Sequence, residues 1–330
     1  MIVITGGAGF IGSAMVWKLN TMGMTDILIV DELGQTEKWK NLVGLKFNDY
    51  LHKDHFLEKL LSEELSVPEA IIHLGANSST TETNVEHLME NNFSYTKDLA
   101  LFSVTRGIRF IYASSAATYG NGEQGYDDSL NKIENLRPLN AYGYSKHIFD
   151  LWSIKREFHF KTVGLKFFNV FGPNEYHKGD MASVVYKAFN QISEKGFVKL
   201  FQSHREGFND GEQLRDFVYV KDCCDVMVWL LQNPEVNGIY NLGTGKARSF
   251  KDLVNATFKA LQKESNIEYI PMPEHLRGKY QYFTEANMER LKGQGCPVKF
   301  LTLEESVADY VQHYLSAADQ HFRLSEPINT

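Results

Sequence analysis

The chain has 330 residues, 43% of them hydrophobic, which is enough apolar content for one large globular domain or two unequal ones. Its formal net charge of -7 excludes a general attraction to nucleic acid or to an anionic membrane, so an anionic substrate must be met by locally placed cations. Cys223, Cys224 and Cys296 lack CxxC spacing and indicate neither a disulfide framework nor a metal site, and the absence of a cationic leader or a long apolar run predicts a cytoplasmic protein.

The chain opens on an apolar, strand-like run, residues 2–5, that leads into glycines and then into a helical pattern. Gly6, Gly9 and Gly12 are spaced so that the turn can tighten, the backbone can approach a pyrophosphate, and a helix N-terminus can face the anion. A second apolar strand ends in Asp31, where an acid commonly accepts a hydrogen bond from a ribose hydroxyl. These residues predict a dinucleotide-binding βαβ unit; the alternative is a glycine-rich turn without a ligand.

Further apolar runs alternate with helical patterns, and they are residues 70–74, 110–113 and 162–168. Alternation of this kind is typical of parallel strands that are covered on both faces. We therefore predict an α/β fold, a doubly wound parallel sheet (Rossmann fold), over residues 1–168.

From about Asn169 the composition changes to glycine, proline and charge, which predicts a long active-site loop. A smaller, mixed α/β substrate domain is expected over residues 169–330. Strand-like runs within residues 215–246 predict that the chain returns to the first domain. Thr302, followed three positions later by Glu305, predicts a capping box ahead of an amphipathic closing helix.

Two polar motifs lie where chemistry would occur. Tyr142 and Lys146 are four positions apart at the start of a predicted helix, so their side chains share one face. An ammonium group beside a phenol favours the phenolate, which predicts a lowered pKa for Tyr142. Ser114 and Ser115 follow a predicted strand, and either hydroxyl could hold a substrate oxygen at the carboxyl edge of the sheet. Taken alone, a Tyr–Lys pair is more often part of a solvated helix face.

Together these motifs resemble the extended short-chain dehydrogenase/reductase family, and the matching residues are 5–12, Ser115, Tyr142, Lys146, 215–220 and 241–245. The resemblance implies a nucleotide-sugar substrate, a bound nicotinamide cofactor, and catalytic roles for Ser115, Tyr142 and Lys146. Dehydratases of this family carry an acidic pair where this chain has Ala116 and Ala117. Epimerisation is therefore favoured over elimination.

A narrower resemblance, to the ADP-heptose 6-epimerase branch of that family, is carried by residues 177–183 with residues 47–50, 78–82, 169–173 and 269–273. It implies interconversion of ADP-D-glycero- and ADP-L-glycero-β-D-manno-heptose by transient oxidation at C6″, for lipopolysaccharide core synthesis. It also implies a homo-oligomer, for example a homopentamer. The rival functions are a UDP- or GDP-sugar 4-epimerase and a non-catalytic cofactor-sensing module.

Inversion through a ketone presents the hydroxyl to opposite walls of a site in turn, so a separate acid/base group is needed on each side. The resemblance implies Tyr142 on one side and Lys178 on the other, with Lys146 orienting the cofactor ribose. Asp31 and Glu32 favour NAD, whereas Lys38 is implied to contact a 2′-phosphate, and we predict NADP with NAD as the alternative. The other cofactor-binding residues implied are Phe10, Ile11, Lys53, Leu74, Gly75, Ala76, Asn77, Ser78, Asn91, Val170 and Lys178.

The resemblance also implies a set of substrate contacts, which are Ser79, Asn169, Asp180, Lys187, Phe201, Gln202, Ser203, His204, Arg215 and Tyr280. Arg215, followed by Lys187, is the best candidate for the diphosphate of an ADP-sugar, because an acidic protein must meet it with positioned cations. Asp180 and residues 201–204 depart from the pattern of the family.

Overall fold

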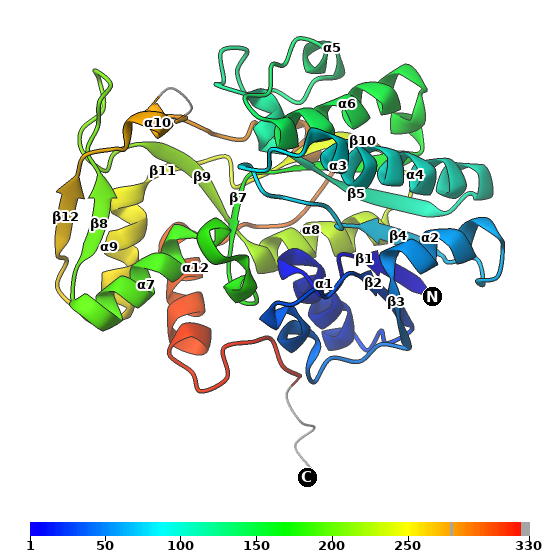
Figure 1. Ribbon diagram of the computed structural model, residues 1–330, viewed down its shortest axis with the longest axis horizontal. Helices are drawn as coiled ribbons and strands as arrows, with labels where there is room; N and C mark the ends of the chain where they lie inside the picture. Colours follow the sequence, from blue (N-terminus) through cyan, green and yellow to red (C-terminus); the bar gives the residue numbers. More distant parts are fainter. Residues whose placement is uncertain (278–279, 325–330) are drawn as a thin grey trace.

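The computed structural model describes residues 1–277 and 280–324. Its main feature is a seven-stranded parallel sheet (Figure 1), in which the strand order changes direction between β1 and β4. In spatial order the strands are β10 (Gly238–Leu242), β6 (Thr162–Phe167), β5 (Arg109–Ser115), β4 (Ala70–His73), β1 (Ile2–Thr5), β2 (Ile27–Asp31) and β3 (Asp49–His52). This is the doubly wound sheet that the sequence predicts, and ligands of such sheets bind where the strand order reverses.

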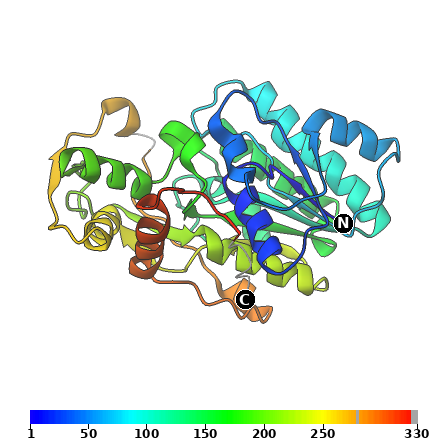
Figure 2. The same ribbon diagram turned by 90° about the horizontal axis from the view of Figure 1, so that it is seen from below.

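Helices cover both faces of the sheet, and the five main ones are α1 (Phe10–Thr21), α2 (Lys53–Leu61), α4 (Tyr95–Arg106), α6 (Ala141–Lys155) and α8 (Val220–Gln232). Helices α1 and α8 pack against each other on one face, and α2, α4 and α6 lie on the other (Figure 2). Successive strand residues point to opposite faces. In β1, Ile2 and Ile4 therefore join the core under α1 and α8, whereas Val3 joins the core under α2, α4 and α6.

The second part of the molecule contains two small sheets, made by β11 (Ala247–Ser249), β9 (Leu214–Tyr219) and β7 (Asn169–Phe171), and by β12 (Ile267–Ile270) and β8 (Val198–Phe201). Around them lie α7 (Val184–Lys195), α9 (Phe250–Ala260) and α12 (Leu303–Tyr310). The described residues also form short α-helices, which are α3 (Val85–Leu88), α5 (Leu130–Ile133), α10 (Glu274–Arg277) and α11 (Glu289–Gly293), and several short 3-10 and π segments.

The segment expected to return to the first domain divides between the two parts. β10 pairs with β6 at the edge of the large sheet, whereas β9 pairs with β7 and β11 in a small sheet. At the C-terminal side, α12 begins at the capping box that the sequence predicts, with Thr302 and Glu305 each bonding the backbone of the other. Residues 325–330 of the expected second domain lie outside the described residues. In the described parts of the chain no helix is both long and apolar enough to cross a membrane.

Candidate active site

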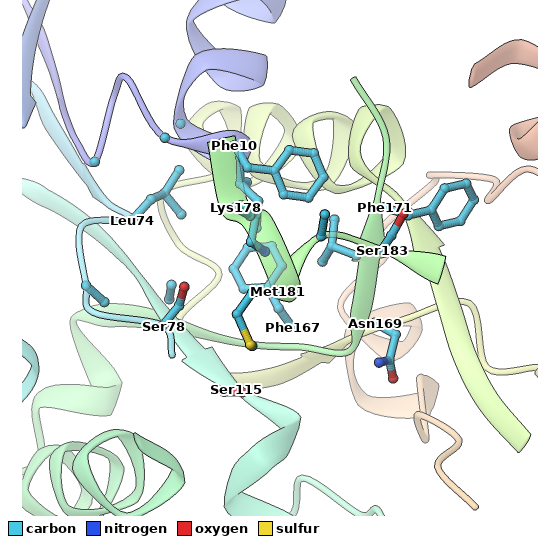
Figure 3. A pocket seen from close by; sticks show the side chains of 18 of the residues that line it. Phe10, Leu74, Ser78, Ser115, Phe167, Asn169, Phe171, Lys178, Met181 and Ser183 are labelled. Atoms are coloured by element: carbon cyan, nitrogen blue, oxygen red, sulfur yellow. The ribbon is translucent and has the colours of Figure 1, made fainter. Parts of the chain in front are cut away.

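A cavity of about 500 Å³ opens at the carboxyl edge of the large sheet, where it meets the second part of the molecule (Figure 3). The sequence-predicted residues that line it are Gly6, Gly9, Phe10, Ile11, Gly12, Asp31, Lys38, Leu74, Gly75, Ala76, Ser78, Ser114, Ser115, Tyr142, Lys146, Asn169, Val170 and Lys178. These residues come from six separate regions of the chain. Among the described residues, no group of three His, Cys, Asp or Glu side chains is arranged as metal ligands.

The glycine turn at one end of the cavity is shaped for close backbone approach. A Cβ atom on Gly12 would lie 2.0 Å from the carbonyl oxygen of Gly6, and one on Gly6 would lie 2.6 Å from the nitrogen of Gly75. Helix α1 starts after Gly9, which offers no side-chain cap to the N–H groups of the first turn. Those donors and the helix dipole suit a phosphate group, so the turn fits the pyrophosphate of a dinucleotide.

A smaller pocket of about 230 Å³ adjoins the glycine turn and contains the charges that bear on cofactor choice. Asp31 accepts a hydrogen bond from the Ala8 N–H at 2.8 Å and pairs with the Lys38 ammonium at 2.5 Å. Lys53 pairs with Glu32 at 2.9 Å, and this contact lowers the pKa of Glu32. The pocket therefore offers two ammonium groups for a phosphate, each already paired with a carboxylate. Asn77 and Asn91 also line it, together with His87 and Tyr95, which the sequence did not indicate.

Tyr142 lies in the first turn of α6, because the side chain of Asn140 caps the helix by accepting from the Gly143 N–H at 2.8 Å. The prediction that the pKa of Tyr142 is lowered is wrong for the protein without a cofactor. Burial raises the pKa of Tyr142, and only a hydrogen bond with Ser115 acts against this. Lys146 is itself 4% exposed, and burial lowers its own pKa to about 8.

A buried polar network lies directly behind Tyr142 and Lys146, and the sequence did not indicate it. Asp150, the next residue on the same face of α6, accepts from the Ser114 hydroxyl at 2.7 Å and from the Lys166 ammonium at 2.6 Å. Asp150 and Lys166 are both fully buried. Because the hydroxyl of Ser114 is committed to Asp150, Ser115 is the serine left to interact with Tyr142.

Lys178 reaches the cavity from a 3-10 turn, Tyr176–Met181, in the loop that follows β7. Its ammonium nitrogen lies 5.3 Å from the centre of the Phe10 ring, and Figure 3 shows the two side chains together on the side of the cavity away from Ser115. Burial lowers the pKa of Lys178. The cavity thus contains two side chains able to transfer protons, one from α6 and one from this loop.

The residues predicted to bind substrate are more widely spread over the structure than those predicted to bind the cofactor. Arg215 lies between the rings of Phe250 and Tyr280, at 5.6 and 5.3 Å from their centres, and Phe250 lines the cavity. Ser203 and His204 line a separate open hollow instead. Further predicted substrate residues that do not line the cavity are Ser79, Asp180, Lys187, Phe201 and Gln202. The Lys187 ammonium donates to the carbonyl of Asp180 at 2.6 Å.

Several lining residues were not singled out from the sequence, and they are His177, Met181, Ser183, Phe167, Phe168, Phe217, Phe250 and Leu253. The first three stand beside Lys178 in the same motif, so the motif itself was a usable signal for them. The apolar residues come from strands and a helix of both parts of the molecule, and their patterns are those of ordinary core residues.

A doubly wound sheet with an uncapped glycine turn, and with Ser, Tyr and Lys at its carboxyl edge, defines a dinucleotide-dependent enzyme that acts on hydroxyl or carbonyl carbon. Residues 2–243 match the model of the NAD dependent epimerase/dehydratase family, and the chain belongs to that family.

Several proteins similar to this chain have a more specific name than that of the family. The chain is 55% identical over 322 residues to an ADP-L-glycero-D-manno-heptose-6-epimerase of Nitratidesulfovibrio vulgaris, an alignment that covers 97% of this chain and 100% of the relative. It resembles the crystal structure of the Helicobacter pylori enzyme of the same name, with a TM-score of 0.79 and 29% identity over 94% of this chain and 95% of that one. Thermus thermophilus UDP-glucose 4-epimerase in complex with NAD matches with a TM-score of 0.73 and 25% identity, over 96% and 99% of the two chains.

Proposed function

We propose that this protein is an ADP-heptose 6-epimerase, which interconverts ADP-D-glycero-β-D-manno-heptose and ADP-L-glycero-β-D-manno-heptose by transient oxidation at C6″. The product would be a precursor of the lipopolysaccharide core. The observation that carries the proposal is the presence of Tyr142 and Lys178 in one cavity, on separate elements. Nearly full-length similarity to relatives of that name supports the same substrate.

A nicotinamide dinucleotide held at the glycine turn by Gly6, Gly9 and Gly12 would supply reversible hydride transfer at the sugar carbon. The hydroxyl of Ser115, at the end of β5, holds the reacting oxygen, and Tyr142 exchanges a proton with it in one orientation of the substrate. Lys178 exchanges a proton with the oxygen after the intermediate ketone has turned to the other wall. Lys146, one turn further along the same face of α6, is the proposed contact for the cofactor ribose.

The cofactor proposed is NADP, with NAD as the alternative. Support comes from Lys38 and Lys53, which bring two ammonium groups to the small pocket beside the glycine turn. Asp31 is already bonded to Ala8 and paired with Lys38, so its charge is largely compensated. The mass of the dinucleotide released from purified protein decides between the two.

Arg215 is the proposed contact for the diphosphate of the sugar nucleotide. It is 7% exposed and is flanked by two aromatic rings, one of which lines the cavity. Its Nη1 and Nη2 atoms also donate to the carbonyls of Leu214 and Gln281, and the remaining N–H groups of the guanidinium are the donors proposed for phosphate oxygens.

The deciding experiment mixes purified protein with ADP-D-glycero-β-D-manno-heptose and resolves the configuration of the product at C6″. We expect an equilibrium mixture of both epimers, with no net consumption of added dinucleotide. UDP-galactose is the parallel substrate. Turnover of UDP-galactose with none of the heptose would contradict the proposed substrate, and turnover of neither would favour the non-catalytic module.

A further inference from the structure

The loop that carries Lys178 is closed at its base by a single buried carboxylate, that of Glu175, which is 0% exposed. Its Oε2 accepts from the Ser183 N–H at 2.6 Å, and its Oε1 accepts from the Ser183 hydroxyl at 2.7 Å. Oε1 also accepts from the Gly172 N–H at 3.4 Å. The carboxylate therefore joins the two ends of the loop, and the turn that bears Lys178 lies between them.

Glu175 and its neighbour also hold the main chain around Lys178. The Lys178 N–H donates to the carbonyl of Glu175 at 3.0 Å. Asn174 has a left-handed backbone (φ 75), a conformation that Asn tolerates better than most residues, and its side chain donates to the Ser13 hydroxyl of α1 at 2.9 Å. Asn41 donates both to the carbonyl of Asn174 and to a carbonyl of the glycine turn, each at 3.0 Å. The segment before Lys178 is thus fixed to the cofactor-binding turn.

The same carboxylate is an electrostatic partner of the lysine. Burial lowers the pKa of Lys178, and the negative charge of Glu175 opposes that change. In return, Lys178 and the hydrogen bonds from Ser183 oppose the rise that burial causes in the pKa of Glu175. The other titratable groups that face this pair are His177 and Tyr176, on the same turn, and Tyr310 of α12. An ionised Glu175 therefore favours the ammonium form of the lysine.

We propose that Glu175 is a positioning residue for Lys178, which fixes the loop through Ser183 and places a negative charge behind the ammonium group. Glu175 lies behind the wall of the cavity, so its effect on the substrate passes through the lysine. A proton-transfer group on a loop needs such support, because a displacement of roughly 1 Å can cost about 100-fold in rate. The inference rests on the proposed acid/base role of Lys178.

The first test replaces the charge while keeping the shape. In Glu175→Gln, an amide oxygen remains to accept from Ser183, but the counter-charge of Lys178 is lost. We expect kcat to fall about 10- to 100-fold with little change in KM, and the alkaline limb of the kcat–pH profile to move to lower pH. Glu175→Asp keeps the charge and should lower kcat without moving that limb. Glu194→Gln, on the exposed side of α7, is the matched control and should leave both unchanged.

A double-mutant cycle separates this role from a merely structural one. If Glu175 acts through the lysine, Glu175→Gln should cost far less in the Lys178→Met background than in the wild type. An equal loss in both backgrounds, or an unmoved alkaline limb, would overturn the proposal. Circular dichroism and bound dinucleotide check that each variant is folded; if Glu175→Gln is not, the cycle is made with Glu175→Asp.

A substrate-independent measurement keeps this proposal distinct from the proposed function. Acylation of Lys178 by acetic anhydride is followed against pH by peptide mass spectrometry, because only the neutral amine reacts. The midpoint should move to lower pH in Glu175→Gln. An unmoved midpoint would refute the role of Glu175 even if the wild type turns over ADP-heptose, whereas failure to turn over ADP-heptose with a shifted midpoint would refute only the function.

Discussion

At the level of single residues, burial moves both proposed acid/base groups toward their neutral forms. It raises the pKa of Tyr142 and lowers that of Lys178. At neutral pH the phenol therefore holds a proton that it can donate, and the lysine releases its proton more readily than a solvated amine. Two groups with these tendencies can exchange the roles of acid and base as the substrate turns, which is what epimerisation in both directions requires.

Removal of either group should stop epimerisation without removing the cofactor. For Tyr142→Phe and for Lys178→Met we predict a loss of roughly 10²- to 10⁴-fold in kcat, because each removes one proton-transfer step. Dinucleotide content, measured by absorbance of the purified protein, should stay at the wild-type level. Tyr144→Phe and Lys195→Met, at exposed positions on α6 and α7, are the controls. Near-normal turnover by Lys178→Met would exclude the two-base scheme.

The sequence could predict those parts of the site whose partners are local. Tyr142 and Lys146 share a helix face because of their spacing, and Gly6, Gly9 and Gly12 act within one turn. The raised pKa of Tyr142 could not be predicted, because it depends on how much solvent the surrounding chain removes.

The role of Glu175 could not be predicted from the sequence either. In the sequence it is one charge in a polar loop, and its role depends on a fold that brings Gly172 and Ser183 to the same carboxylate. A charged residue in such a loop is usually solvated.

At the level of elements, α6 carries the proposed catalytic residues Tyr142 and Lys146 and is itself fixed to the sheet by a buried ion pair. Tyr142, Lys146 and Asp150 follow one another at four-residue spacing along one face of the helix. Asp150 then bonds Ser114 of β5 and Lys166 of β6. The helix that carries the proposed acid is therefore connected to the strand that carries Ser115.

Lys166→Met should be strongly destabilising. It leaves the carboxylate of Asp150 buried without its cation, and we predict that the free energy of unfolding falls by about 3 to 5 kcal/mol. Urea denaturation followed by fluorescence measures the change. Lys155→Met, at the exposed end of α6, is the control and should change stability by less than about 0.5 kcal/mol. A small effect of Lys166→Met would mean that water or a rearranged side chain replaces the ammonium group.

At the level of the whole molecule, one hydrophobic core runs through both parts of the chain, from Ile2 to Phe322. We propose that residues 1–168 form the cofactor domain together with the return segment 215–246, of which α8 and β10 belong to that domain and β9 to a small sheet. β10 completes the large sheet, and α8 covers α1. The apolar runs could be predicted from the sequence, but the placement of β9 in a small sheet could not, because its pattern equally suits an edge of the large one.

A fragment of residues 1–168 should therefore not fold alone. It lacks the strand that pairs with β6 and the helix that packs on α1, so apolar surface on both would face water. Near-ultraviolet circular dichroism and thermal unfolding of the fragment, beside the full chain, test this. A cooperative transition with dinucleotide binding by the fragment would show that the first 168 residues are sufficient.

The path of the chain between the two parts of the molecule affects how ligands enter and leave the site. The chain passes between the large and small sheets at β6–β7, β9–α8 and β10–β11, and near its end Phe322 stacks on Trp17 of α1 at 4.4 Å. An opening of the two parts of the molecule about a single hinge would strain all of these connections at once. Sugar nucleotides are therefore expected to enter and leave through local movement at the mouth of the site, while the dinucleotide beneath them stays in place from one turnover to the next.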